Sequence, residues 1–244
     1  MSTVVSGGTV ATDGAYTVRT FTESGMLTVS GGTLANVQYL LVAGGGQAAF
    51  PTSTYVAGGG AGGVLTGNIT LSAGSYPVEI GAVGNNSSFL NMVANGGGQG
   101  GFYGNGSVGG SGGGGGTLGT THIYFENFVG GAGVEGQGHA GGSPYGGGYP
   151  PFGPGGGGGA GTVGGTGTAD GVGGAGGFGL ASDITGNLEF YGTGGSGKGP
   201  NGIGNNRPGY TNYGAGGGYD LSPDNYYNRL DAQPGVLIIR YPTP

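Results

Sequence analysis

Several short patterns in this chain match motifs that hold a catalytic nucleophile or a phosphate. Residues 109–113 read Gly-Gly-Ser-Gly-Gly, which matches the G-x-S-x-G turn that exposes a hydrolase serine, here Ser111. That turn needs a strand before it and a helix after it, but glycine runs flank Ser111 on both sides. Lys198 follows glycines like a P-loop lysine, but Gly199 stands where the P-loop needs Ser or Thr. The sequence therefore predicts neither site.

The glycine content explains such matches. Glycine accounts for 73 of the 244 residues. At this frequency roughly six or seven G-x-G-x-x-G patterns arise by chance, so these patterns do not indicate a dinucleotide site.

The residues that could bind a metal are few and dispersed. His122 and His139 have no cysteine nearby, and His122 shares a predicted loop with Glu126. Asp170 lies near glycines but does not belong to a repeated calcium-binding nonapeptide. We therefore predict no metal, no cofactor and no catalytic constellation, and expect the protein not to be an enzyme.

Charge and composition exclude further classes. The net charge is −6 with only five Lys plus Arg, which argues against binding nucleic acid through phosphate neutralisation. The absence of Cys excludes disulfides and thiolate metal sites. The longest apolar runs, such as Val236–Ile239, are too short to span a membrane, and the N-terminal residues do not predict a signal peptide.

Both ends of the chain have the patterns of ordinary β-strands. Residues 37–43 form a nearly continuous apolar run, typical of a strand buried on both faces. The alternation in residues 15–22 shifts at Phe21, which predicts a bulge or an edge. Pro77 predicts an edge or a strand start. The remaining predicted strands are residues 26–29, 69–71, 76–80 and 235–241, the last pairing with the N-terminal strands.

Glycine runs fill the middle of the chain. Flexible disorder is the default for such composition, but 15 Tyr and 9 Phe, clustered between the runs, favour an ordered scaffold. Chains without Cβ atoms pack closely as polyglycine II helices, which form no internal hydrogen bonds and bond to their neighbours instead. We predict a mostly irregular, all-β fold, in which a small terminal β-sheet or sandwich closes on an inserted bundle of polyglycine II helices.

The whole chain, residues 1–244, is predicted to be one glycine-rich domain. Residues 1–43 and 235–244 are its β framework, and residues 44–234 are the polyglycine II core with tip loops.

Stretches rich in Tyr, Phe, Asn, Ser and Pro separate the glycine runs. This composition resembles a binding surface with rigid aromatic anchors and adaptable polar neighbours, and successive loops of a bundle alternate between its two ends. The alternative is that the aromatics only cap the bundle and shield its backbone. The predicted receptor-binding residues are Tyr124, Phe125, Phe128, Tyr145, Tyr149 and Phe152, with Tyr210, Tyr213, Tyr226 and Tyr227 as a second group.

Framework segments, taken together and in order, resemble the glycine-rich domain of bacteriophage tail-fibre tip adhesins. The segments are residues 16–29, 37–46, 58–64, 71–81, 86–89 and 235–242. The resemblance implies a polyglycine II sandwich whose variable tip loops recognise a bacterial surface protein or glycan. It also implies a place in the virion, at the tail fibre or tail tip, beside other tail-fibre proteins. The matched residues are framework, so the resemblance carries over the fold and not the contact residues.

Other functions remain open at this point. A purely structural virion protein, such as a fibre cap or a trimerising connector, would form a tight homo-oligomer and tolerate changes in its loops. An ice-binding bundle would need a flat face of small residues and Thr, which irregular aromatic loops disfavour. A cell-wall structural protein fits the ordered ends less well.

Overall fold

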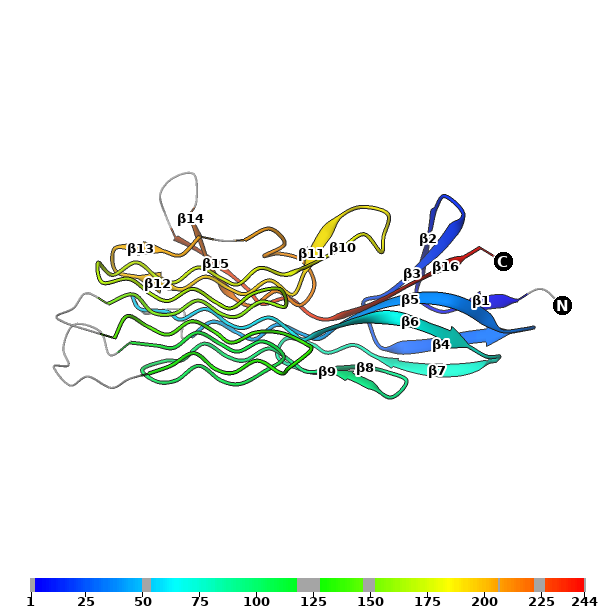
Figure 1. The fold of residues 1–244 in the computed structure, drawn as a ribbon, viewed down its shortest axis with the longest axis horizontal. Helices are drawn as coiled ribbons and strands as arrows, with labels where there is room; N and C mark the ends of the chain where they lie inside the picture. The colour runs from blue at the N-terminus through cyan, green and yellow to red at the C-terminus, as the bar shows by residue number, and fades with distance from the viewer. Residues whose placement is uncertain are drawn as a thin grey trace.

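The computed structural model describes residues 3–49, 54–117, 128–146, 152–205, 207–221 and 227–243. In these residues the chain forms β-strands and irregular segments and no helix. The molecule is elongated, with two large sheets at one end and glycine-rich segments at the other (Figure 1). The N- and C-terminal strands both lie at the sheet end.

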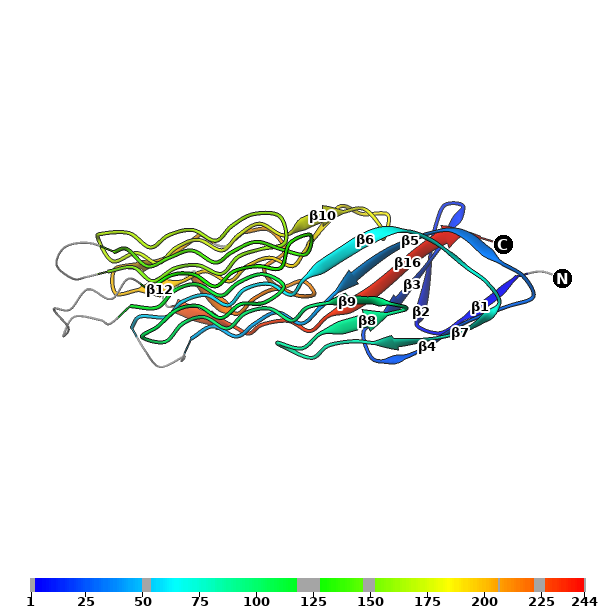
Figure 2. The ribbon, with the colours of Figure 1, turned by 60° about the horizontal axis from the view of Figure 1, so that its bottom comes forward.

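Two five-stranded antiparallel sheets make up the sheet end. The first sheet contains, in spatial order, β1 (Val4–Ser6), β4 (Gly25–Ser30), β7 (Gly74–Glu79), β8 (Ser87–Phe89) and β9 (Met92–Ala94). The second contains β2 (Thr9–Asp13), β3 (Tyr16–Phe21), β16 (Val236–Pro242), β5 (Leu34–Val42) and β6 (Val64–Leu71). We call these sheets the two-sheet base; Figure 2 shows the strands of both.

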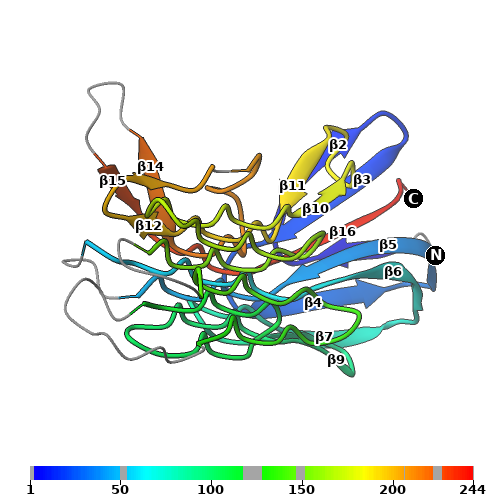
Figure 3. The same cartoon turned by 60° about the vertical axis from the view of Figure 1, so that its left-hand side comes forward.

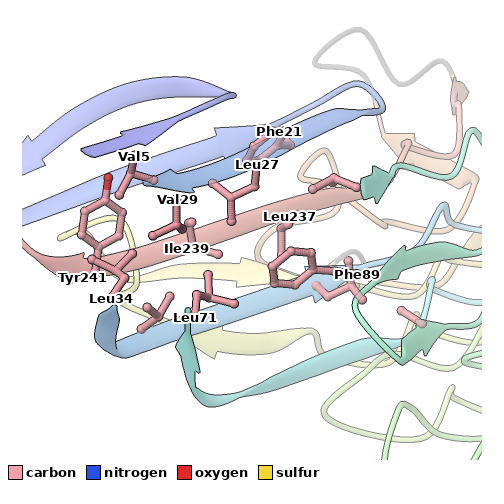
Figure 4. Packing of buried hydrophobic residues seen from close by; sticks show 14 of the residues in the cluster. Val5, Phe21, Leu27, Val29, Leu34, Leu71, Phe89, Leu237, Ile239 and Tyr241 are labelled. Atoms are coloured by element: carbon pink, nitrogen blue, oxygen red, sulfur yellow. The ribbon is translucent and has the colours of Figure 1, made fainter. Parts of the chain in front are cut away.

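One hydrophobic cluster joins the two sheets. Leu27 and Phe89 from the first sheet meet Leu41 and Leu237 from the second, and all four are fully buried (Figure 4). The opposite face of the second sheet packs on a hairpin of β10 (Leu180–Ser182) and β11 (Glu189–Tyr191). The centre of the second sheet is therefore buried on both sides.

The order of strands confirms the predicted closure of the chain. β16 pairs with β3 on one side and with β5 on the other, so the last strand lies at the centre of the second sheet. The prediction that β5 is buried on both faces is confirmed for Leu40–Val42, since Leu40 and Val42 face the hairpin side and Leu41 faces the first sheet.

The bulge predicted at Phe21 is wrong, because the register of β3 with β16 is continuous there. The alternative, a local edge, agrees with the structure, since β2 pairs with Tyr16 to Thr20 and Phe21 has a paired strand only on the β16 side. Val18 belongs to the cluster under the β10–β11 hairpin, whereas Phe21 belongs to the cluster between the sheets. The apolar pattern shifts because one strand supplies side chains to two different cores.

Pro77 and the framework boundary differ in detail from expectation. β7 is an inner strand, but β8 pairs only with Val78 and Glu79, so at Pro77 β4 is the paired neighbour. A residue that lacks an N–H donor is tolerated at this position, because only one neighbouring strand pairs with it.

The boundary of the β framework also differs from the prediction. The sequence analysis assigned residues 64–94 to the polyglycine II core, but they form β6 to β9 of the two-sheet base.

Glycine-rich segments of residues 43–63 and 95–235 form the other end, which we call the glycine block. They run back and forth side by side (Figures 1 and 3). Three hairpins belong to it: β10–β11, β12–β13 (Lys198–Gly199 with Gly202–Ile203) and β14–β15 (Gly218–Leu221 with Tyr227–Leu230).

Backbone hydrogen bonds connect segments of the glycine block that are far apart in sequence. Gly59 N–H donates to Gly217 at 2.8 Å, and Gly157 N–H donates to Gly195 at 2.8 Å. The segments approach so closely that a Cβ atom added to Gly157 would overlap the carbonyl oxygen of Gly59. Glycine is therefore required here for close approach of backbones.

Candidate binding surface

The end of the glycine block away from the base is a hydrogen-bonded layer of backbone. Strands β12 to β15 lie toward this end (Figure 1), and Val56 pairs with Lys198 of β12. Five N–H···O bonds of 2.8 to 3.1 Å connect the six glycines of this layer: Gly58, Gly101, Gly114, Gly115, Gly142 and Gly155. We call these residues the end layer. It fixes the positions of the residues that immediately follow or precede it.

Two adjacent aromatic residues follow the end layer directly after Gly101. The side chains of Phe102 and Tyr103 are 42 % and 47 % exposed, and their ring centroids are 4.1 Å apart at an interplanar angle of 36°. Tyr55, three residues before Gly58, is half-buried close by. Burial, and then the neighbouring Tyr103, raise the pKa of the Tyr55 phenol. Tyr103 is therefore backed by a second phenol.

Another aromatic pair lies just beyond Gly142 and Gly155. The ring centroids of Tyr145 and Phe152 are 6.4 Å apart, with an interplanar angle of 30°. Tyr145 N–H donates to Gly153 O at 3.0 Å, which joins the two segments below the rings. Tyr145 is 39 % exposed and Phe152 is half-buried. We call Tyr55, Phe102, Tyr103, Tyr145 and Phe152 the aromatic tip.

Tyr219 in β14 is buried inside the glycine block and is not exposed to solvent as Tyr103 and Tyr145 are. Its side chain is buried with Val56 and Ile203, and the Lys198 ammonium lies 4.9 Å from its ring centroid. Burial raises the pKa of the Tyr219 phenol, while the charge of Arg229 opposes this shift. This residue fulfils the capping role that the sequence left as the alternative for the aromatics.

The structure does not bring all of the predicted receptor-binding residues together. Tyr124, Phe125, Tyr149 and Tyr226 lie outside the described residues. Tyr145 and Phe152 come together at the aromatic tip. Phe128 is half-buried beside Val129, whose carbonyl accepts the Gly106 N–H at 2.9 Å, so it belongs to the same end of the block.

Tyr213 lies apart from the aromatic tip, whereas Tyr210 bonds to a residue of β14. Tyr213 packs against the cluster under the β10–β11 hairpin, and its carbonyl accepts the Gly192 N–H at 3.1 Å. Tyr210 donates its hydroxyl to Asp220 at 3.3 Å, and the charge of Asp220, followed by burial, raises the pKa of its phenol. Tyr213 therefore does not share a surface with Tyr145 and Phe152. Tyr227, the remaining described member of the second predicted group, lies in β15.

Sequence reasoning missed Phe102 and Tyr103. The turn that carries them is short, so it lacks the length and mixed composition of the other predicted loops. The available signal was two consecutive aromatic residues interrupting the glycine-rich stretch from residue 96 to residue 116.

The residues singled out for chemistry are placed as follows. Ser111 is fully buried inside the glycine block. His139 lines a shallow groove with Gln137, Leu65 and Leu180, between the block and the base. Across the described ranges, no three His, Asp or Glu side chains gather as metal ligands. Within the same ranges the structure contains no helix long and apolar enough to cross a membrane.

No protein-family model matches the chain, and a search of curated proteins finds no match.

Proposed function

We propose that the chain is a tail-fibre tip adhesin of a bacteriophage, which binds a receptor on the bacterial surface through the aromatic tip. The observation that carries the proposal is that Phe102, Tyr103 and Tyr145 are exposed beside the end layer, on the side of the glycine block away from the two-sheet base. Large aromatic side chains held at one end of a scaffold supply contact area at a low cost in conformational entropy.

The scaffold fits this function as a sandwich joined to a polyglycine II bundle. The two sheets share one core in the manner of a sandwich. Outside turns such as the one that Gly138 N–H closes on Val134 O, the backbone hydrogen bonds of the described glycine segments connect neighbouring segments, which is the hydrogen-bonding pattern of polyglycine II. A circular dichroism spectrum with α-helical minima would contradict this part of the proposal.

A rigid backbone beside the aromatic side chains would favour binding. The end layer connects five separate segments, so the backbone beside each aromatic side chain is held from more than one side. Binding then orders few additional groups, and more of the contact energy contributes to affinity. A flexible glycine chain carrying the same aromatic residues would lose this advantage.

The test is binding of the labelled full-length chain to a panel of bacterial strains, measured by flow cytometry. We expect the wild type to bind a subset of strains, and the variant combining Phe102→Ala, Tyr103→Ala and Tyr145→Ala to lose binding while keeping its thermal stability. Tyr16→Ala is the matched control, because Tyr16 is similarly exposed but lies in the base. Intact binding by the triple variant would favour a purely structural virion role instead.

A further inference from the structure

We infer that the turn formed by Phe102 and Tyr103 is a binding site for an uncharged glycan of the bacterial surface, an assignment that rests on the proposed adhesin function.

The backbone at Tyr103 is the first observation. Its φ angle is +49°, in the left-handed region, where a bulky residue is an outlier. Other turns of the glycine block place glycine at such positions, with φ of +75° at Gly136 and +82° at Gly171. In a chain so rich in glycine, a tyrosine at this position costs backbone strain that a glycine would avoid.

Burial in a core does not offset this cost. The side chains of Phe102 and Tyr103 remain 42 % and 47 % exposed, whereas the buried aromatics Phe89 and Tyr191 are 0 % and 1 % exposed. Strain that persists at an exposed residue without stabilising the core points to a function outside the fold. Two rings 4.1 Å apart form a preformed aromatic surface.

The chemistry around the rings indicates which ligand they fit. Residues 80–121 contain no Asp, Glu, Lys or Arg. The two segments that meet at the turn are joined by Ser107 N–H donating to Gln99 O at 2.9 Å, and both residues are exposed. Asn105 is exposed as well, and its side-chain oxygen accepts the Val129 N–H at 2.9 Å. The flank of the turn therefore presents amides and a hydroxyl without charge.

Aromatic rings beside amides and hydroxyls suit a neutral sugar. The C–H groups on one face of a pyranose carry partial positive charge and are attracted to the negative face of an aromatic ring. The sugar hydroxyls both donate and accept, which matches the donors and acceptors of Gln, Asn and Ser side chains. An anionic glycan would need a cation, and tight protein interfaces commonly use Arg anchors; residues 80–121 supply neither. Lys198, which pairs with Val56 at this end, has its ammonium 4.9 Å from the ring centroid of the buried Tyr219.

The experiment separates the ligand class from the adhesin function. Strains that the full-length chain binds are treated either with periodate, which cleaves sugar diols, or with protease, which removes surface proteins. We expect periodate to abolish binding. Loss after both treatments also supports the inference, because the sugar is then attached to a protein. Loss after protease alone overturns it and leaves the adhesin function in place, whereas absence of binding to every strain contradicts the adhesin function itself.

Variants test the turn directly on the same cells. Phe102→Ala combined with Tyr103→Ala should weaken binding about 30-fold, as expected for a pair of aromatic anchors, while Tyr16→Ala should not change it. Tyr103→Gly should bind weakly yet melt no lower than the wild type, because glycine accepts the positive φ. Unchanged binding by the double variant, or a lower melting temperature of Tyr103→Gly, would overturn the inference.

Discussion

The two ends of this molecule hold together by opposite means. In the two-sheet base, side chains such as Leu27, Leu41 and Leu237 fill the space between sheets. In the glycine block, the neighbour of each backbone is another backbone, and a Cβ at many positions would overlap a carbonyl oxygen. The base depends on what its side chains add, whereas the block depends on the absence of side chains.

This contrast shows how a chain with few apolar residues can still form an ordered core. A buried backbone hydrogen bond contributes about 0.5–1.5 kcal/mol net, against about 1–2 kcal/mol for fixing one residue. The block alone is therefore marginal, and anchoring by the base supplies the remainder. The hydrophobic cluster under the β10–β11 hairpin, which includes Val42, Val236 and Tyr191, lies where the two ends meet.

The largest effect should come from a single methyl group inside the block. Gly157→Ala places Cβ against Gly59 O and near Gly60 N, and backbone atoms cannot change rotamer to make room. We expect a loss of more than about 3 kcal/mol in the free energy of unfolding, measured by denaturant titration. Gly146→Ala is the control, because no atom lies within 4 Å of the added Cβ, and it should be neutral. Equal stability of the two variants would contradict the view that the glycine block depends on the absence of side chains.

Truncating a buried side chain in the base should lower the free energy of unfolding nearly as much, because here the side chain itself fills the core. Leu237 is fully buried between the sheets, so Leu237→Ala leaves a cavity and should destabilise the protein by about 3 kcal/mol. The same titration measures it. A cost below about 1 kcal/mol would mean that the base does not rely on side-chain packing.

A polar contact between the two sheets of the base should have a smaller effect. Ser87 is fully buried, and its hydroxyl accepts the Gly81 N–H at 2.9 Å and donates to Val42 O at 2.8 Å. Ser87→Ala leaves both backbone groups without this partner and should cost about 1–3 kcal/mol. Amide hydrogen exchange at Gly81 should accelerate, and unchanged exchange there would argue against the role of this contact.

The smallest effect concerns pH. Burial, followed by the charge of Glu189 and the hydrogen bond to it, raises the pKa of Tyr191 well above the ordinary value of 10. The unfolded tyrosine loses its proton above about pH 10 while the folded one keeps it, so stability falls as pH rises beyond that point. The slope is at most about 1.4 kcal/mol per pH unit. Tyr191→Phe should show a shallower decline above pH 10, and an identical decline would refute this assignment.

Much of the base could be predicted from sequence because its signals are local. The continuous apolar residues of β5 indicated burial on both faces, and those of β16 indicated a strand that pairs with the N-terminal strands. The role of Phe21 could not be inferred, because alternation along one strand does not tell which of two cores receives each side chain.

The candidate site was harder to predict, since it depends on which loops meet in space. Tyr145 and Phe152 flank the same loop, so their proximity followed from sequence separation. Tyr213 resembles them in type and setting, yet it lies at the β10–β11 hairpin because its segment turns at the other end of the block. Composition is the same at both ends of the block, and only the path of the chain distinguishes them.

The central place of β16 has a consequence for how the protein folds. Val236 pairs with Val42, so the whole glycine block is an excursion between two neighbouring strands. The second sheet lacks its middle strand until residues 236–242 have been synthesised. Contacts of such long range slow folding and leave β3 and β5 exposed in the interval. β3 and β5 therefore wait for a shared neighbour that lies about two hundred residues further along the chain, whereas the strands of the first sheet all come from its first hundred residues.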